Sequence, residues 1–304
     1  MNTKIEQLIN NIETVILGKR DVIEKIVCAL IAGGHVLIED VPGVGKTLLA
    51  ETLARSVSGS FGRIQFTPDL MPSDVIGYTV IDQRTGETSY RAGAAMCNFL
   101  LADEINRTSP KVQSSLLEAM EELQISVDGI THKLPTPFMT LATQNPIETY
   151  GTYHLPEAQL DRFLMRLSIG YPDRKAELQM LEKMPQKMAV QPVMTLDDVL
   201  QLRETANNVK VSEQVKAYIL MIIGATRTRQ EIKLGASPRA SIALYKAAQA
   251  MAVINDRDFA TPDDVKSMAV SVLSHRVLLA AGQTAFVSAD EIIGHILAET
   301  VVPV

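Results

Sequence analysis

The stretch DVPGVGKTLL, residues 40–49, decides the fold class of this chain. It follows the apolar run HVLI at residues 35–38 and precedes a stretch with helical spacing. A phosphate-binding loop needs glycines whose N–H groups turn inward, a lysine that reaches the terminal phosphates and a hydroxyl that holds magnesium, all at a helix N-terminus. One segment supplies these groups, and we expect it to bind a nucleotide: Pro42, Gly43, Val44, Gly45, Lys46, Thr47 and Leu48.

The loop departs from the general phosphate-loop pattern at one position. The pattern G-x-x-x-x-G-K-[ST] has glycine where this chain has Asp40. We expect Pro42 and Gly43 to shape the loop instead. Because a short pattern also recurs by chance in proteins that bind no nucleotide, the strand before it and the helix after it are the context that supports this interpretation.

The chain divides into an α/β part and a helical part. Strand-like runs alternate with helical patterns as far as Tyr171, which predicts a parallel sheet covered by helices. The predicted strands are 35–39, 63–66, 98–102, 138–143 and 166–169. Beyond Pro172 amphipathic helices take over, with N-cap signals at Thr195 and Thr261, each followed three residues later by an acid. We predict an α/β domain over 1–172, a linker over 173–194 and an all-helical domain over 195–304.

Two predicted hairpins interrupt the α/β pattern. Residues 124–134 contain Asp128-Gly129 between two strand-like stretches, and this dipeptide favours a two-residue turn. Residues 75–90 turn near Arg84-Thr85-Gly86. Neither hairpin is needed to bind a nucleotide. Each is therefore a candidate for a moving or partner-contacting part, or else it extends the sheet edge.

Polar side chains end two of the predicted strands. Asp103 and Glu104 follow the apolar run at 98–102, and Asn145 follows the strand at 138–143. Phosphoryl transfer requires mainly positioning and charge neutralisation, so Asp103 is a candidate magnesium ligand and Glu104 a candidate for orienting the attacking water. The amide of Asn145 offers both a donor and an acceptor to a phosphate and a water. Without the neighbouring motifs, Asn145 would be only a turn residue before Pro146.

Two arginines are candidates for contact with the terminal phosphate. Arg162 ends a helical stretch before the last predicted strand, and an arginine supplied to a neighbour's γ-phosphate raises rates by about three to five orders of magnitude elsewhere. The alternative is an ion pair with Asp161 or Glu157. Arg239 lies in the first turn of a helix that begins at Ser237. A cation there opposes the helix dipole, which indicates an external anion or an acidic side chain from elsewhere.

Composition excludes several classes of protein. The net charge is −6 over 304 residues, so the chain lacks the basic character of a protein that binds nucleic acid non-specifically. No apolar run reaches 18 residues and the N-terminus has no signal-peptide pattern, so we expect no membrane insertion and a cytoplasmic protein. Cys28 and Cys97 fit buried thiols of a reducing compartment. No metal-ligand spacing is present among His35, His132, His154, His275 and His295.

Several motifs in fixed order resemble those of the MoxR family of AAA+ ATPases. They are the phosphate loop, DEINR at 103–107, ATQNPIE at 142–148, LPEAQLDRF at 155–163 and GASPRAS at 235–241. The resemblance covers essentially the whole chain. It implies a P-loop AAA+ three-layer α/β domain with strand order 5-1-4-3-2 and a C-terminal helical lid. It also implies ATP and Mg²⁺ as cofactors and a ring, commonly a hexamer, with active sites between subunits.

The resemblance also assigns roles residue by residue. Lys46 and Thr47 resemble the Walker A pair, and Asp103 and Glu104 resemble Walker B. The remaining assignments are Asn145 to sensor 1, Arg162 to the arginine finger, Arg239 to sensor 2 and the segment ending at Gly18 to adenine contact. Arg107 and Arg166 are further candidates for action across the interface. The two hairpins resemble the helix-2 insert and the pre-sensor-1 hairpin.

The resemblance implies a chaperone-like ATPase that works with a von Willebrand factor A domain protein. This chain has no DxSxS metal-adhesion motif, so such a domain would belong to another chain, and the client is unknown. We expect hydrolysis to move the lid against the sheet domain, with Arg239 and Lys46 both sensing the γ-phosphate.

Four alternatives are the ATPase subunit of a magnesium chelatase, a nucleic-acid motor, a nucleotide switch that does not hydrolyse, and a small-molecule kinase. The net charge of −6 disfavours the nucleic-acid motor. Glu104 disfavours the switch. The kinase would not explain Asn145, Arg162 and Arg239 together.

Overall fold

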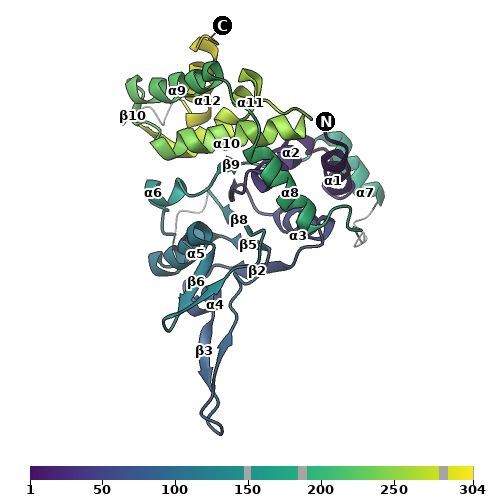
Figure 1. The fold of residues 1–304 in the computed structure, drawn as a ribbon, viewed down its shortest axis with the longest axis vertical. Coiled ribbons are helices and arrows are strands. Elements are labelled where there is room, and N and C mark those ends of the chain that lie inside the picture. Colours follow the sequence, from purple (N-terminus) through teal and green to yellow (C-terminus); the bar gives the residue numbers. More distant parts are fainter. Residues whose placement is uncertain (147–151, 184–189, 281–286, 304) are drawn as a thin grey trace.

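One parallel five-stranded sheet forms the centre of the molecule (Figure 1). The computed structural model describes residues 1–146, 152–183, 190–280 and 287–303. The strands lie in the order β2 (Phe61–Gln65), β5 (Phe99–Asp103), β8 (Met139–Gln144), β1 (Val36–Glu39) and β9 (Met165–Leu167). If these five strands alone are numbered 1 to 5 in chain order, the sheet reads 5-1-4-3-2 from β9 to β2. The predicted order is therefore confirmed.

The predicted strands are all present, with ends within two residues of those expected. One of the two largest differences is at β9, which ends at Leu167 although the prediction extended to Ile169. Beyond Leu167 the N–H groups of Ile169 and Gly170 donate to the carboxylate of Asp40. A side chain from the phosphate loop thus takes the donors that a longer strand would use.

Helices cover both faces of the sheet. Because side chains alternate along a strand, Val36 and Ile38 of β1 lie in one hydrophobic core and Leu37 lies in the other. The first core contains residues of α1 (Thr3–Glu13), α2 (Arg20–Ile31) and α3 (Lys46–Ser56). The second contains residues of α5 (Pro110–Glu122). Burial of both faces explains why β1 and β5 begin as continuous apolar runs, and it gives three layers.

Five helices form the lid that follows the sheet domain. They are α8 (Leu196–Asn207), α9 (Glu213–Thr228), α10 (Pro238–Ile254), α11 (Pro262–Leu273) and α12 (Ala289–Glu299). The lid also contains a short antiparallel pair, β10 (Ile232–Leu234) with β11 (Leu278–Leu279), so the prediction of a purely helical domain needs this correction. Residues of α10 share one continuous core with α2 and the sheet.

Short elements fill the connections. They are α4 (Pro72–Ile76), the 3-10 turn η1 (Ile105–Arg107), α6 (Glu157–Leu160), α7 (Arg174–Lys183) and the 3-10 turn η2 (Ser274–Arg276). The predicted linker at 173–194 therefore contains a helix, α7. The last two residues of the ATQNPIE motif lie outside the described residues.

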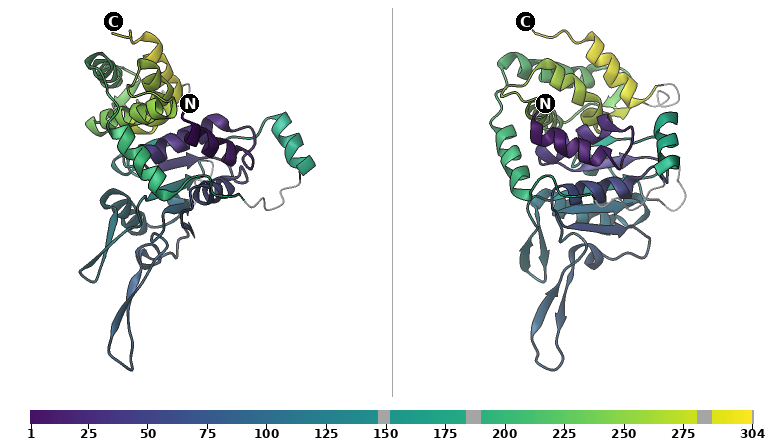
Figure 2. Two further views of the ribbon diagram at one scale, coloured as in Figure 1. Left: turned by 45° about the vertical axis from the view of Figure 1, so that its right-hand side comes forward. Right: turned by 90° about the vertical axis from the view of Figure 1, so that its right-hand side faces the viewer.

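The two predicted hairpins form separate two-stranded sheets. They are β3 (Tyr78–Ile81) with β4 (Thr88–Arg91), and β6 (Gln124–Val127) with β7 (Ile130–Lys133). Both views in Figure 2 show the first hairpin at the end of the molecule opposite the lid. Tyr90 stacks on His132, with ring centroids 3.9 Å apart, so the hairpins contact each other. Neither hairpin pairs with the central sheet, which rules out the alternative that they extend its edge.

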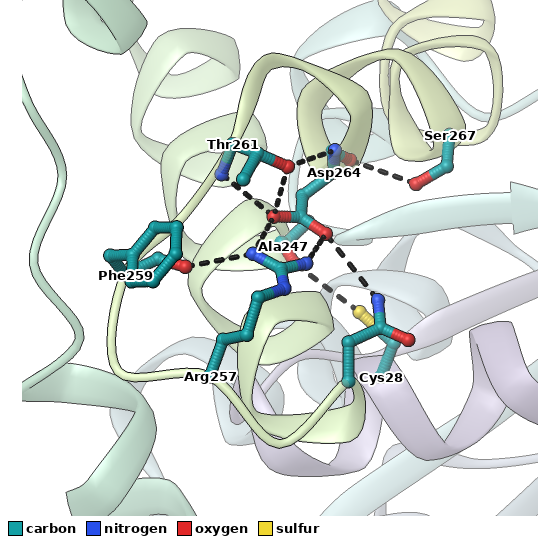
Figure 3. A network of polar contacts seen from close by, with 8 residues as sticks. Cys28, Ala247, Arg257, Phe259, Thr261, Asp264 and Ser267 are labelled. Atoms are coloured by element: carbon teal, nitrogen blue, oxygen red, sulfur yellow. Dashed lines mark hydrogen bonds and ion pairs between the residues drawn. The ribbon is translucent and has the colours of Figure 1, made fainter. Parts of the chain in front are cut away.

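The predicted N-caps of the lid are present, and one anchors a polar network (Figure 3). The carboxylate of Asp264 accepts from the backbone N–H and the hydroxyl of Thr261, at 2.8 and 2.9 Å. Arg257 binds the same carboxylate through two nitrogens, at 2.8 and 2.5 Å. Since Asp264 is buried, these bonds compensate for its desolvation and fix the loop between α10 and α11.

Candidate active site at the carboxyl edge of the sheet

The phosphate loop is open where a ligand would approach the backbone. Gly43 and Gly45 have φ angles of 88° and 89°, a left-handed conformation that favours glycine. No heavy atom lies within 4 Å of the point where a Cβ would stand on either residue. Gly45 is the N-cap of α3, and a helix N-terminus presents unpaired N–H groups and a positive dipole end to an anion. The loop therefore forms an unobstructed cradle for phosphate.

Lys46 and Thr47 begin α3 and lie in the same cavity as the cradle, a space of about 410 Å³. The ammonium group of Lys46 donates to the carbonyl oxygens of Asp40 and Val41, at 3.0 and 3.3 Å. All the expected loop residues line this cavity except Val44. The side chain of Val44 packs against the hydrophobic core. Any contact of Val44 with a nucleotide would use its backbone.

Asp40 explains the departure from the general loop pattern. Its Oδ2 accepts from the N–H groups of Ile169 and Gly170 at 2.6 and 2.7 Å, and from the hydroxyl of Ser168 at 3.2 Å. Its Oδ1 accepts from the N–H of Val41 at 2.9 Å. Asp40 thus ties the start of the loop to the end of β9. Sequence reasoning missed this role because the partners are about 130 residues away.

Asp103 and Asn145 meet the loop at the carboxyl ends of β5 and β8, as predicted for side chains at one edge of a parallel sheet. The carboxylate of Asp103 is buried. Its Oδ1 accepts from the hydroxyl of Thr143 at 3.2 Å, and its Oδ2 accepts from Nε of Arg63 at 2.9 Å. Asn145 also lines the cavity. Arg63 is a neighbour that sequence reasoning missed.

Glu104 is held in an unusual conformation beside Asp103. Its φ of 56° lies in the left-handed region, which is uncommon for a residue other than glycine and occurs often at functional sites. Its N–H donates to Thr143 Oγ1 at 2.9 Å. Its Oε2 accepts from the amide of Gln65 at 2.7 Å and from Arg107 at 3.1 Å. Two donors therefore restrain this carboxylate, and Gln65 was also missed from the sequence.

The cavity fits a nucleoside triphosphate with a divalent cation. The open cradle, Lys46 and the helix N-terminus suit phosphate, and the Thr47 hydroxyl and the Asp103 carboxylate are oxygen ligands of the kind Mg²⁺ prefers. Nowhere in the described parts of the chain do three or more His, Cys, Asp or Glu side chains cluster as a metal site. A cation bound through phosphates and water needs no such cluster.

Gly18 lies outside this cavity. Its φ is 69°, and a Cβ there would stand 3.1 Å from Cβ of Ala176 in α7. The neighbouring Lys19 donates to the carbonyl of Tyr171 at 2.7 Å. This segment therefore contacts the start of α7, and its contact with adenine stays a prediction.

Arg162 and Arg239 lie together in a second cavity of about 220 Å³. Nε of Arg162 is 3.0 Å from Oε2 of Glu121, and Arg239 binds Oε1 of the same carboxylate. Arg162 does form an ion pair, as the alternative interpretation held, but its partner is Glu121 and not Asp161 or Glu157. Lys46 and Arg239 line different cavities, and the expectation that both sense the γ-phosphate stays a prediction.

A buried arginine fastens the lid beside Arg162. Nε of Arg276 donates to Oδ1 of Asp161 at 2.6 Å, and its other nitrogens donate to the carbonyls of Phe163 and Leu164 at 2.5 and 2.9 Å. Burial lowers the pKa of Arg276, although Asp161 opposes the shift. The hydroxyl of Ser237, the N-cap of α10, donates to Oδ2 of Asp161 at 2.9 Å. The helix that carries Arg239 is thus attached to the segment that carries Arg162.

The remaining candidates have partners within the chain. Arg107 binds Glu104, as described above. Arg166 binds Glu39 at 3.1 Å and Asp290 at 2.5 Å, so it joins the sheet to α12.

Burial raises the pKa of the Cys28 thiol, and it raises the pKa of Cys97 to about 11. Both thiols are buried and unpaired by disulfides, as expected.

Among the helices the structure describes, none has the length and apolar character required to cross a bilayer.

Comparisons with known proteins agree with this geometry. The family model "ATPase family associated with various cellular activities (AAA)" matches residues 35–165, and an AAA lid domain model matches residues 224–296. The uncharacterised protein YeaC of Bacillus subtilis is 48% identical over 300 residues, with 97% of this chain and 94% of YeaC covered. Chaperone MoxR1 of Mycobacterium tuberculosis is 41% identical over 310 residues, with 98% and 81% covered.

A solved structure of a candidate ATPase from Cytophaga hutchinsonii superposes with a TM-score of 0.92 at 40% identity, covering 99% of this chain and 95% of that one. Fold, phosphate loop and lid together define an AAA+ protein, a class that binds and hydrolyses ATP. Within that class, the chain belongs to the MoxR family of ATPases.

Proposed function

We propose that this ATPase completes its active site between neighbouring subunits of a ring, with six subunits by family resemblance, and uses Mg-dependent ATP hydrolysis to remodel a partner protein. One observation carries the proposal. Lys46, Asp103 and Glu104 share one cavity, whereas Arg162 and Arg239 share another. A single chain therefore offers the groups that bind phosphate and orient water, but it brings no arginine of the second cavity to them. A second copy would supply those arginines.

Each side chain then has a defined task at the edge of the sheet. When bound, ATP supplies the phosphoanhydride and Mg²⁺ neutralises charge on its phosphates. Thr47 and Asp103 hold the cation, and Lys46 exchanges the loop carbonyls for phosphate oxygens. Glu104 accepts a hydrogen bond from water and orients it, once the carboxylate is released from Gln65 and Arg107. Asn145 orients the same water or a phosphate oxygen.

The lid and the arginine pair would respond together to nucleotide on a neighbour. Ser237 and Arg276 of the lid both bind Asp161, which precedes Arg162. Any movement of Arg162 toward a phosphate therefore acts on α10. This coupling supports a mechanism in which hydrolysis at one subunit shifts the lid of the next.

A partner would contact the molecule at the end opposite the lid. Tyr78 and Ile81 of the β3–β4 hairpin are 53% and 63% exposed, and exposed apolar groups on one projection are typical of protein contacts. MoxR1 is named a chaperone, and we propose the same class of activity here. By family resemblance, the partner contains a von Willebrand factor A domain. Changing both residues to serine should leave basal turnover unchanged and prevent co-purification of that partner.

The first test is ATP turnover as a function of protein concentration, with mass measured in the same samples. Specific activity should rise with concentration as an ATP-stabilised oligomer forms. Arg162→Ala should lower turnover by about 10³-fold while ATP binding remains. Arg84→Ala, at an exposed hairpin position, is the matched control and should keep full activity. Turnover by a monomer that ignores the loss of Arg162 would refute the proposal.

A further inference from the structure

Helix α7 presents leucines to solvent. Leu178 and Leu181 are 56% and 77% exposed, whereas Ala176 is buried against the chain. Residues three apart lie on the same side of a helix, so the two leucines form one outward stripe. Glu177 and Glu182, both exposed, flank this stripe, and the exposed Arg174 and Lys175 lie at its N-terminal end. Figure 2 shows α7 projecting from the side of the sheet domain. An outward apolar stripe bordered by charged residues is typical of a helix that docks on another surface.

The lid contains a groove of suitable chemistry between α9 and α10. It has a volume of about 520 Å³, and its apolar wall includes Ile219, Leu220 and Ile242. Leu220 and Ile242 are 61% and 58% exposed. Lys246 lies at the same groove, as does Lys216, which pairs with Glu213 at 2.7 Å. An apolar groove with lysines therefore complements an apolar stripe with glutamates.

The two surfaces belong to opposite halves of the proposed intersubunit site. Ile242 and Lys246 line both the groove and the cavity that holds Arg162 and Arg239. Helix α7 begins beside the phosphate-loop half, because it starts at Arg174, shortly after Gly170, whose N–H donates to Asp40 at the start of the loop. A contact that brings Arg239 of one copy to the phosphate loop of the next therefore also brings the groove toward the α7 of that copy.

We propose that α7 of one copy docks in the lid groove of its neighbour, with Leu178 and Leu181 inserted between α9 and α10. Glu177 and Glu182 then face Lys216 and Lys246. The occupant is a second copy of this chain, because the two complementary surfaces lie on one molecule and in different places. Such a contact is head-to-tail, and repeated head-to-tail contacts form a ring when the rotation between copies closes. The inference rests on the intersubunit site proposed above.

Cysteine cross-linking tests this contact directly. A chain with Leu181→Cys is mixed with a distinguishable chain carrying Leu220→Cys, with ATP present and Glu104→Gln in both chains to prevent turnover. Native Cys28 and Cys97 are buried, so they do not compete. Mild oxidation should give the mixed dimer as the main product. A chain carrying both substitutions should give a ladder of larger species.

The matched control pairs Leu181→Cys with Ile130→Cys, which is 60% exposed on the β6–β7 hairpin. This pair should give at least tenfold less mixed dimer. Equal yields from the two pairs would overturn the docking contact. Mass measurement before oxidation separates two kinds of failure. Assembly without the specific cross-link contradicts only the docking, whereas absence of any ATP-dependent assembly contradicts the intersubunit site as well.

Discussion

Arg162 and Arg239 bind opposite oxygens of one carboxylate, that of Glu121. The first arginine precedes β9 and the second lies in the first turn of α10. Two residues from different domains thus share one counter-ion, on the surface of this chain that we propose faces the next subunit. Glu121 pairs with both guanidinium groups, and under the proposed shared site it would compete with the neighbour's phosphate for them.

Replacing Glu121 with glutamine should strengthen assembly. The amide keeps the size of the side chain and removes the charge that neutralises both arginines, so attraction for a neighbour's phosphate increases. We expect half-maximal ATPase activity at about three- to tenfold lower protein concentration, which corresponds to about 0.6–1.4 kcal/mol of assembly free energy. Glu118→Gln, an exposed acid on the same helix, is the control. Identical concentration dependence for the two variants would contradict this role.

Replacing Glu104 with glutamine should separate binding from hydrolysis. The amide cannot accept a proton from the attacking water, and loss of a general base costs about 10² to 10⁴-fold in rate. Lys46, Thr47 and the open cradle are unchanged, so ATP should remain bound. Single-turnover hydrolysis and retention of labelled ATP on a desalting column measure the two properties. Normal turnover would remove Glu104 from the mechanism.

Replacing Asp40 with glycine should destabilise the protein even though glycine fits the general loop pattern. Four hydrogen bonds to Asp40 would be lost, three of them from residues 168–170. Leaving buried donors unsatisfied costs about 1–3 kcal/mol. Thermal unfolding should shift down by several degrees, about 2–4 °C per kcal/mol. Loss of Asp40 should also weaken nucleotide binding, because Asp40 holds the start of the phosphate loop. Asp74→Gly removes a hydrogen-bonded carboxylate of the insert and is the control for nucleotide affinity. Only the Asp40 variant should weaken it.

Acid should destabilise the fold through His35. Burial lowers the pKa of His35 to about 4 from an ordinary value of 6.5. Its Nδ1 accepts from the N–H of Thr140 at 3.0 Å, so protonation would remove an acceptor. Because the unfolded state binds the proton more tightly, this stability is fully present above pH 6.5 and is lost as the pH falls toward 4.

The pH effect is measured as the free energy of unfolding in urea. The slope contributed by one histidine reaches about 1.4 kcal/mol per pH unit between these two values. Burial also lowers the pKa of His275. The slope of the unfolding free energy with pH in the wild type should therefore be the sum of the contributions from His35 and His275. His35→Gln should reduce the slope, whereas His154→Gln, exposed at the surface, should leave it unchanged. Equal slopes in all three proteins would contradict the assignment.

The sequence allowed the fold to be predicted because its signals are local. Apolar runs gave the strands, Asp128-Gly129 gave a hairpin turn with φ angles of 49° and 81°, and Thr261 with Asp264 gave a helix start. The loop glycines and Lys46 lie within one short segment. These features need no knowledge of distant residues.

The parts that could not be predicted depend on distant side chains. Asp40 meets residues 168–170, Arg63 and Gln65 meet Asp103 and Glu104 about 40 positions away, and Glu121 meets Arg239 across 118 positions. Sheet order places strand ends together, but it does not say which polar side chains form pairs. The position of Arg239 in a second cavity likewise follows from how Arg276 and Ser237 attach the lid to Asp161.

The central claim is that each active site is shared between two copies, and mixing two inactive variants tests it most directly. Lys46→Ala keeps Arg162 but lacks the phosphate-loop lysine, and Arg162→Ala has the opposite defect. Random head-to-tail pairing in an equal mixture restores about one quarter of the sites, so turnover should recover to about that fraction of wild type. A mixture as inactive as its two components, although mass measurement shows mixed rings, would contradict the shared site.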